Sequence, residues 1–212
     1  MSAPQSYYVP VDAGEAEFTE KRSRFLGHVR RVETEAEARA FLDEMRKKYY
    51  DARHNCWCYV LHEGGVVRYG DDGEPQGTAG QPMLNVFQRE GVENVVCVVT
   101  RYFGGVLLGA GGLTRAYARS AKDALDAAGK ARMRLWSAVT VDCPYPMLER
   151  LKLLAAAHGG TVEGTDFGAA VSVRILLPQE NAAGFDAALT ELSAGTMTAR
   201  RESERFLPGL RE

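Results

Sequence analysis

The segment from Arg101 to Arg115 has the residue types and spacing of an anion-binding turn. It reads RYFGGVLLGAGGLTR and carries its glycines between an apolar run and a helical pattern. Backbone N–H groups can approach a ligand closely at glycine, and a helix N-terminus adds partial positive charge. Guanidinium groups at both ends would suit a phosphate or carboxylate. The candidate anion contacts are Arg101, Gly104, Gly105, Gly109, Gly111, Gly112, Thr114 and Arg115, joined by Arg53 from an earlier segment.

This turn matches neither of two standard nucleotide-binding motifs. No Gly-Lys-Ser or Gly-Lys-Thr follows the glycines, as the phosphate-binding loop of P-loop proteins requires. The Gly-x-Gly-x-x-Gly register of dinucleotide-binding turns is also missing. A tight strand-to-helix connection whose glycines serve packing alone is the alternative, and the sequence leaves both interpretations open.

A second candidate segment, at 71–80, reads DDGEPQGTAG. Its carboxylates, Asp71, Asp72 and Glu74, could bind Mg²⁺ through water or accept hydrogen bonds from a basic partner. A solvated turn in which Asp and Gly provide local hydrogen bonds and positive φ explains the same composition. We favour the turn, expect no bound metal and no cofactor, and expect Thr78 to cap the helix that follows.

A third segment, RHNCWC at 53–58, places His54, Cys56 and Cys58 on one face of a strand. Three ligands without a fourth make a poor zinc site, because adjacent strand positions rarely surround a tetrahedral ion. His54 could instead carry a proton, or pair with one of these cysteines as a nucleophile. Buried structural cysteines are the preferred interpretation. The candidate proton carriers of a catalytic site are then His54, Asp72 and Glu74.

The overall charge excludes a general polyanion binder. The 212 residues carry a formal net charge of −2, and 45% are hydrophobic and 25% charged, as in ordinary globular chains. There are 19 basic and 18 acidic residues up to Leu135, and 7 basic and 10 acidic residues after it, so neither part is a basic module. Basic residues at 21–24 and 30–31 fit an ordinary polar strand face. Any contact with nucleic acid must therefore be local.

The sequence predicts a cytoplasmic protein without membrane contact. No apolar run approaches the roughly 18 residues that a membrane-spanning helix needs. Residues 1–10 lack the basic and apolar parts of a secretory signal. Three of the four cysteines lie in apolar, strand-like runs, which is typical of reduced thiols in a cytosol.

The elements that must position these residues alternate between strands and helices. We expect extended structure over 18–32, a helix opened by a capping box at Thr34 and Glu37, strands at 55–61, 66–69 and 95–100, and a short helix at 83–88. The valine-rich run at 95–100 is typical of a strand buried on both faces. The clearest helix follows the glycine-rich turn. Its predicted inner face is Leu113, Ala116, Tyr117, Ser120, Ala121, Ala124, Leu125 and Ala128.

The remainder of the chain predicts a second unit. Its expected elements are strands at 137–143, 161–165, 169–177 and 196–206, with one helix after Pro146 and one around Phe185. This β-α-β-β-α-β order is that of the split βαβ, or ferredoxin-like, plan. The chain is therefore predicted to be α+β, with domains at 1–135 and 136–212.

Four motifs together resemble the IMPACT family, in particular its bacterial YigZ-type members. They are KRSRF at 21–25, ARHNCW at 52–57, the 71–80 segment with Pro82 and Met83, and 101–117. The resemblance implies a ribosomal protein S5 domain-2-like fold for residues 1–135 and a ferredoxin-like second domain, similar to a domain of translation elongation factor G. Cys58 departs from the family pattern, in which a small residue such as alanine is expected.

The resemblance implies a role in translation for the eukaryotic relatives. These proteins compete for an activator of the kinase that responds to amino-acid starvation, and they use an additional N-terminal RWD domain in part of that interaction. We expect this chain to lack that domain, so the kinase-pathway role does not transfer.

Two functions from different classes remain open. One is a regulator or binding module of the translation machinery whose cleft holds RNA phosphate, a nucleotide or an acidic peptide, with the ribosome, RNA or a translation factor as partner. The other is an enzyme acting on a small phosphorylated or carboxylated metabolite. In that enzyme His54, Asp72 or Glu74 would carry protons, and Arg101 or Arg115 would hold the oxyanion. A peptide-binding adaptor that uses the acidic loop is a third interpretation.

Overall fold

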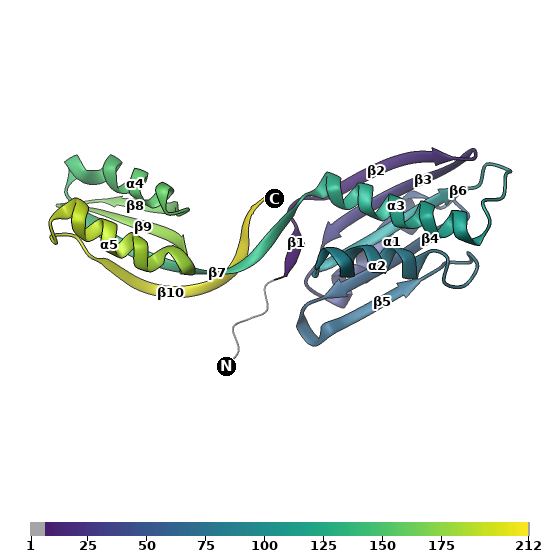
Figure 1. Ribbon diagram of the computed structural model, residues 1–212, viewed down its shortest axis with the longest axis horizontal. Coiled ribbons are helices and arrows are strands. Elements are labelled where there is room, and N and C mark those ends of the chain that lie inside the picture. The colour runs from purple at the N-terminus through teal and green to yellow at the C-terminus, as the bar shows by residue number, and fades with distance from the viewer. Residues whose placement is uncertain (1–6, 212) are drawn as a thin grey trace. The chain divides into compact units, whose positions relative to one another are not determined.

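The computed structural model describes residues 7–211, which form two compact units. The first unit runs to Arg132 and also includes the segment from Pro208, and the second is Met133–Leu207. Both units combine helices with a β-sheet, so the chain is a two-domain α+β protein, as predicted (Figure 1).

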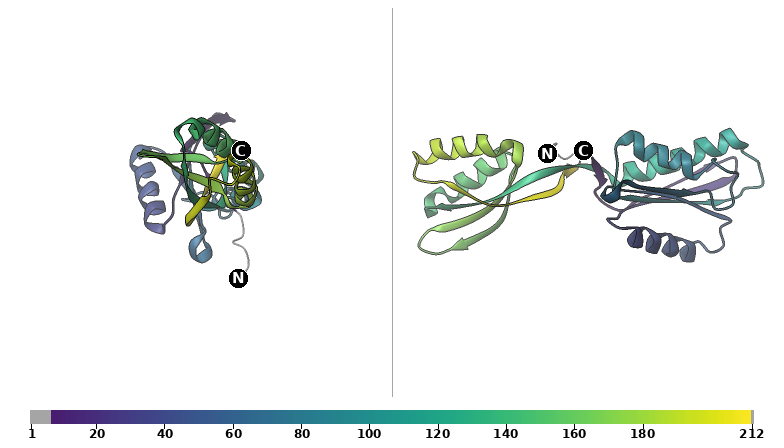
Figure 2. Two further views of the ribbon diagram at one scale, coloured as in Figure 1. Left: turned by 90° about the vertical axis from the view of Figure 1, so that its left-hand side faces the viewer. Right: turned by 90° about the horizontal axis from the view of Figure 1, so that it is seen from below.

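The first unit is a five-stranded sheet with helices on both faces. Its strands, in spatial order, are β2 (Gly14–Glu20), β3 (Ser23–Arg31), β6 (Val95–Tyr102), β4 (His54–Leu61) and β5 (Val66–Gly70). Helix α1 (Glu35–Lys48) covers one face, and α2 (Gly80–Glu90) and α3 (Ala110–Ala128) cover the other, as the right-hand view of Figure 2 shows. A short 3-10 turn at Glu63–Gly65 joins β4 to β5.

The central strand β6 is buried on both faces, as its valine run predicted. Val96 and Val98 pack in the core against α1, whereas Val95, Cys97 and Val99 belong to the core beneath α2 and α3. Its antiparallel neighbours β3 and β4 place Phe25 and His54 opposite Arg101. The register of the sheet thus brings the end of β6 beside the start of β4.

The predicted face of α3 is confirmed residue by residue. The same eight positions, from Leu113 to Ala128, are its buried residues, and Gly129 follows as the C-cap with φ of 68°. The buried stripe consists mostly of Ala and Ser, which lets the helix lie close to the sheet. A Cβ added to Gly27 of β3 would lie only 2.5 Å from the carbonyl oxygen of Ser120.

The capping box of α1 is confirmed in its first half. The Thr34 Oγ1 accepts a hydrogen bond from the Glu37 backbone N–H at 3.2 Å. The Glu37 carboxylate, however, accepts from the backbone N–H of Glu33 at 2.6 Å, one residue before the position that a reciprocal box uses. Ala38, Phe41, Leu42 and Met45 form the buried side of this helix.

Several elements extend beyond their predicted bounds. Helix α2 begins at Gly80 rather than 83, because Pro82 lies in the first turn, where its missing N–H costs nothing. Strand β7 begins at Lys130 rather than 137, since its first residues pair with β1 (Tyr8–Pro10). Strand β10 (Ala199–Arg211) continues five residues past the predicted end at 206.

The second unit has the predicted β-α-β-β-α-β order. It comprises most of β7 (Lys130–Cys143), then α4 (Leu148–Ala157), β8 (Thr161–Phe167), β9 (Val171–Pro178), α5 (Ala182–Ser193) and most of β10, with 3-10 turns at Tyr145–Met147 and Gln179–Asn181. The strands neighbour one another in the order β10-β7-β9-β8. Both helices lie on one face of this sheet (Figure 2). No helix within residues 7–211 is long and apolar enough to cross a membrane.

Candidate functional site

Three loops of the first unit lie at the same end of its sheet (Figure 1). They are the β2–β3 turn, the loop at 71–79 and the loop at 103–109 before α3. The last two, with the starts of β4 and α3, enclose a cleft of about 350 Å³, which we call the main cleft. Of the residues predicted from sequence, Arg53, His54, Glu74, Arg101 and Gly109 all line it.

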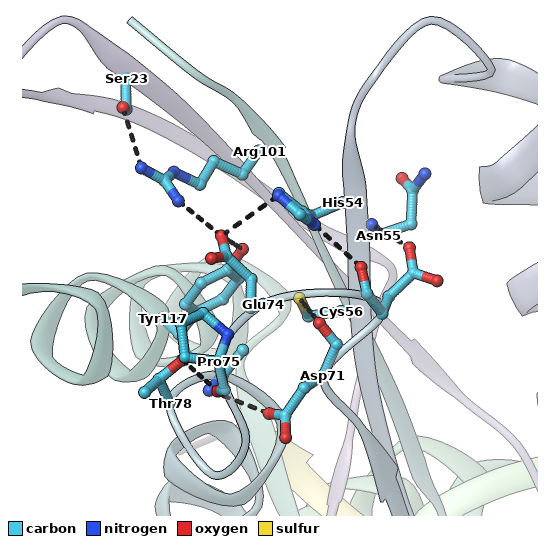
Figure 3. A network of polar contacts seen from close by, with 12 residues as sticks. Ser23, His54, Asn55, Cys56, Asp71, Glu74, Pro75, Thr78, Arg101 and Tyr117 are labelled. Carbon is cyan, nitrogen blue, oxygen red and sulfur yellow. Dashed lines mark hydrogen bonds and ion pairs between the residues drawn. The ribbon is translucent and has the colours of Figure 1, made fainter. Parts of the chain in front are cut away.

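The carboxylate of Glu74 is the centre of a buried polar network at this cleft (Figure 3). Its side chain is 3% exposed. Its Oε1 accepts hydrogen bonds from Arg101 Nη1 at 2.6 Å and from the Tyr117 hydroxyl at 2.8 Å. A buried carboxylate requires such donors, because an unpaired charge in this environment would be strongly unfavourable. Glu74 is thus held in one position by residues from β6 and α3.

Tyr117 contributes more than its sequence position indicates. Helical spacing places it in the core of the first unit, and it is fully buried there. Burial raises the pKa of Tyr117, and the neighbouring Cys56 and Glu74 raise it further. The hydroxyl therefore keeps its proton and donates a hydrogen bond to Glu74. No local pattern links these two residues, which are 43 positions apart.

Arg101 is already partly neutralised by Glu74. Its guanidinium is in contact range of the Phe25 and Phe103 rings, at 5.6 and 5.5 Å from their centroids, and its Nη2 donates to Ser23 Oγ at 3.4 Å. Arg101 is only 5% exposed. Its Nε has no hydrogen-bond partner among residues 7–211. One buried cationic donor in the cleft wall is thus unsatisfied.

His54 presents one ring nitrogen toward Glu74 (Figure 3). Its Nδ1 lies 2.8 Å from the backbone carbonyl oxygen of Asp72. A carbonyl oxygen only accepts, so Nδ1 carries the hydrogen and Nε2 of the neutral ring is an acceptor. Nε2 lies 4.0 Å from Glu74 Oε1 in a side chain that is 14% exposed. The acceptor nitrogen of His54 therefore faces the cleft beside the Glu74 carboxylate.

Asp71 and Asp72 bind backbone amides of their own loop and of β4. Asp71 accepts from the N–H groups of Gly77, Ala79 and Gly80 at 2.8 to 3.1 Å, and so caps α2. The prediction that Thr78 caps this helix is wrong, because its hydroxyl donates to Pro75 O at 2.6 Å (Figure 3). Asp72 Oδ2 accepts from the Asn55 N–H at 2.6 Å. Within the described part of the chain, no three His, Cys, Asp or Glu residues form a group that could hold a metal.

The cysteines of β4 belong to the core beneath α2 and α3. Cys56 and Cys58 are both fully buried, and the Cys56 thiol donates to Asp71 O at 2.9 Å. Burial raises the pKa of the Cys56 thiol well above its usual range. A thiolate nucleophile at this position is therefore disfavoured, even though His54 and Cys56 lie on the same strand face.

The first turn of α3 is open to the main cleft. Its N-cap, Gly109, has φ of 72°, and no side chain caps the helix. Gly109, Ala110 and Gly111 are exposed. The free N–H groups of the first turn and the positive end of the helix dipole therefore lie at the cleft wall.

The other predicted glycines have separate roles. The N–H of Gly104 donates to Ser23 Oγ at 3.2 Å, and a Cβ added there would lie 2.0 Å from the backbone of Arg22. Gly104 thereby fixes the 103–109 loop against the β2–β3 turn. Gly105 is exposed with φ of 82°, and a Cβ there would meet no atom within 4 Å.

Arg115 lies apart from Arg101, although the sequence places them at the two ends of one turn. Arg115 and Gly112 line a second hollow, of about 250 Å³, beside the β2–β3 turn. The separation arises because Arg101 extends from β6 beneath the loop, whereas Arg115 lies on an exposed side of α3. Thr114 is exposed and lines neither hollow.

Comparison with known proteins gives a consistent family relation. Residues 21–125 match the Impact N-terminal domain, and residues 141–196 match a domain of unknown function (DUF1949). The chain is 35% identical over 191 residues to the IMPACT family member YvyE of Bacillus subtilis, covering 90% of this chain and 88% of that protein. It is 35% identical over 180 residues to YigZ of Escherichia coli, covering 84% and 88%.

A solved structure supports the fold. The crystal structure of a hypothetical protein matches with a TM-score of 0.59 at 32% identity, covering 95% of this chain and 99% of the other. The family resemblance in the four sequence motifs is thereby confirmed. The chain belongs to the IMPACT family.

Proposed function

We propose that this protein is a cytoplasmic regulator or binding module of the translation machinery, whose main cleft holds an anionic group of its partner. The translation role rests on the family relation, because the resemblance implies such a role for the eukaryotic relatives. The anion-binding role rests on the residues of the cleft. The ribosome, an RNA or a translation factor would be the partner.

The observation that carries the anion-binding role is the unpaired Nε donor of Arg101 beside the open end of α3. Both line the same cleft. The Nε has no hydrogen-bond partner and the start of α3 has no side-chain cap within residues 7–211. Arg53 adds an exposed guanidinium, which has no hydrogen bond or ion pair among the described residues. A phosphate or carboxylate oxygen at this position would satisfy all three.

The counter-charge of Glu74 limits how much negative charge the cleft can take. Glu74 balances Arg101, which leaves Arg53 and the helix end as the net positive features. Phe103 and Leu107, both exposed, make another part of the lining apolar. The cleft is therefore suited to one anionic group attached to an apolar or aromatic moiety.

The family relation also leads us to propose specific folds. The first unit would have the ribosomal protein S5 domain-2-like fold, and the second the ferredoxin-like fold. The bounds expected for these domains from sequence, 1–135 and 136–212, stay a prediction beside the compact units described above. The β-α-β-β-α-β order of the second unit supports its assignment.

A binding series with Arg53→Ala tests the proposal. Ribosomes, tRNA and mononucleotides are titrated at several salt concentrations, with Arg89→Ala as the matched control at the far end of α2. We expect Arg53→Ala to weaken binding about tenfold or more, as the loss of one charge-assisted contact predicts, and Arg89→Ala to leave it unchanged. Absence of binding to every probe, or equal losses in both variants, would refute the proposal.

Enzymatic acid–base chemistry is the second candidate function, and His54 is the observation that favours it. Its fixed tautomer leaves Nε2 as a proton acceptor in the cleft, next to the carboxylate of Glu74. Purified protein is incubated with mixed phosphorylated and carboxylated metabolites, with and without Mg²⁺. Turnover that His54→Asn abolishes while the fold is kept would establish an enzyme, and absence of turnover in the wild-type protein would exclude it for these substrates.

A further inference from the structure

The second hollow, beside the β2–β3 turn, is lined by basic side chains, two of which form no ion pair within residues 7–211. We call it the α3 hollow; it is lined by Phe18, Glu20, Lys21, Leu108, Arg115 and Arg119, together with small residues of α3. Arg119 is held by Asp123 at 3.3 Å and lies over the Phe18 ring at 4.2 Å. Its charge is therefore already compensated.

Lys21 and Arg115 are the available cations of this hollow. Both are exposed, and neither has a hydrogen bond or ion pair to any residue in the range 7–211. Glu20 is the acidic residue in the lining. The hollow thus has an excess of one positive charge, which is the amount that one phosphate would neutralise.

The β2–β3 turn presents its basic residues in an unusual backbone conformation. Lys21 and Arg22 have φ of 45° and 65°, a region that costs an ordinary residue about 1 kcal/mol or more. The turn is nevertheless kept in place, since Gly104 packs directly on the Arg22 backbone. Two lysine or arginine side chains are therefore held at a tip where glycine or asparagine would be expected.

The α3 hollow and the main cleft are adjacent. Leu108 lines both. The α3 residues of the main cleft are Gly109, Ala110 and Leu113, whereas those of the α3 hollow are Gly112, Arg115, Ala116 and Arg119. At 3.6 residues a turn these sets lie on neighbouring sides of one helix, whose diameter is about 10 Å. Cations thus line two hollows that adjoin at the start of α3.

We propose that the main cleft and the α3 hollow together bind phosphates of one single-stranded nucleic acid, with the exposed ring of Phe103 stacking on a base. The proposal rests on the proposed function, because the main cleft takes one of the phosphates. Single-strand binding sites combine such cations with an aromatic surface, and Phe103 is 43% exposed beside Arg101.

The small net charge of the first part of the chain favours a short single strand over a duplex as the ligand. The first part of the chain has only one excess positive charge, so few phosphates can be neutralised at once. Two phosphate contacts on a single strand predict that log affinity falls with log salt with a slope of about −1.4. A longer basic surface would give a much steeper dependence.

Calorimetric titration with an eight-nucleotide oligouridylate and with uridine monophosphate tests the proposal. The full-length chain is compared with Lys21→Asn, Arg115→Gln, Arg53→Ala and, as control on the opposite face of the sheet, Lys47→Gln. Asparagine tolerates the positive φ of position 21, and all these positions are exposed, so the fold is expected to persist.

We expect the oligonucleotide to bind at least about tenfold more tightly than the monophosphate, through the second contact. Lys21→Asn and Arg115→Gln should each weaken binding of the oligonucleotide and make the salt dependence of that binding shallower by up to about 0.7 in slope. The affinity for the monophosphate should stay unchanged in both variants. Lys47→Gln should alter neither.

Three outcomes would overturn the inference, and they differ from failure of the proposed function. The first is that oligonucleotide and monophosphate bind with equal affinity and that Arg53→Ala abolishes the binding of both. The main cleft would then bind one phosphate, and the α3 hollow would add no contact. An acidic peptide that binds as tightly, with the same dependence on Lys21 and Arg115, would make the surface a peptide site. Binding of neither nucleic-acid probe would refute this inference, and loss of all anion binding would refute the proposed function as well.

Discussion

At the scale of single residues, the main cleft is held by the contacts of one carboxylate. Glu74 accepts hydrogen bonds from Arg101 and Tyr117, which lie on different elements of the first unit. Removing one partner of a buried ion pair leaves the other charge uncompensated, which costs about 3–5 kcal/mol. Arg101 is therefore both a wall of the cleft and a structural residue.

Arg101→Ala is expected to lower the free energy of unfolding by about 3–5 kcal/mol, because Glu74 is then buried without its cation. The double variant Arg101→Ala/Glu74→Gln should recover part of this loss, since the uncompensated charge is gone. Urea unfolding followed by circular dichroism measures both, with the exposed Arg115→Ala as a control expected to stay within about 0.5 kcal/mol. A double variant no more stable than the single one would contradict this role of Glu74.

His28 makes stability depend on pH. Burial lowers the pKa of His28 despite the opposing effect of Glu15, whose Oε1 lies 3.3 Å from Nδ1. Neither ring nitrogen has a partner with hydrogen-bond geometry within the described range. The unfolded chain therefore binds a proton more readily than the folded one. The folded state is therefore most stable where His28 is neutral in both states, above the unfolded-state pKa of about 6.5. Part of that stability is lost as the pH falls from there through the folded-state pKa.

We expect the free energy of unfolding to fall between pH 7 and pH 5 by more in the wild-type protein than in His28→Leu. The leucine removes the titrating group and keeps an apolar side chain where the imidazole lies, 4% exposed. Urea unfolding of both proteins across this range measures the difference. Parallel pH profiles would show that another group is responsible.

At the scale of elements, the acidic loop at 71–79 starts a helix rather than presenting free carboxylates. Asp71 accepts from three amides, two of them at the start of α2. Asp71→Ala should therefore lower the free energy of unfolding by about 1–2 kcal/mol, as the loss of a helix cap does. Asp71→Asn keeps one acceptor oxygen and should lose less. Thermal unfolding of both variants distinguishes them, and equal losses would count against the cap.

Local patterns predict the elements but not the contacts between them. Helical spacing identifies the whole buried face of α3, and the valine run identifies β6 as central, because both depend on burial alone. The pairing of Glu74 with Tyr117, and of Arg101 with Ser23, joins positions 43 and 78 residues apart. The position of Thr78 before α2 predicted a helix cap, yet Asp71, which lies eight and nine residues before the amides that it accepts from, takes that role.

At the scale of the whole molecule, the second unit is an insertion in the first. The chain leaves the first unit after Arg132 and returns to it at Pro208. Arg211 then interacts with Asp12 at 3.6 Å and donates to Ala127 O at 3.1 Å, both within the first unit. The order of predicted elements indicates two parts, but no local pattern shows that the last residues return.

Excising residues 133–207 and joining Arg132 to Pro208 with a short glycine linker should leave a folded first unit. The ends of the second unit are neighbours, since Trp136 Nε1 donates to Leu207 O at 3.1 Å, and such units can be removed without stretching the chain. Cooperative thermal unfolding and retained mononucleotide binding by the shortened protein are the expected results. A shortened chain that lacks cooperative unfolding would show that the first unit depends on the second.

All four cysteines are buried, and this has a practical consequence for following ligand binding. In the native state none of them presents an accessible thiol to a maleimide dye, so the protein needs no cysteine-free background. A cysteine introduced at Leu107, which is 82% exposed at the rim of the main cleft, would be the single labelling position. A fluorophore attached there would report directly on whatever enters the cleft.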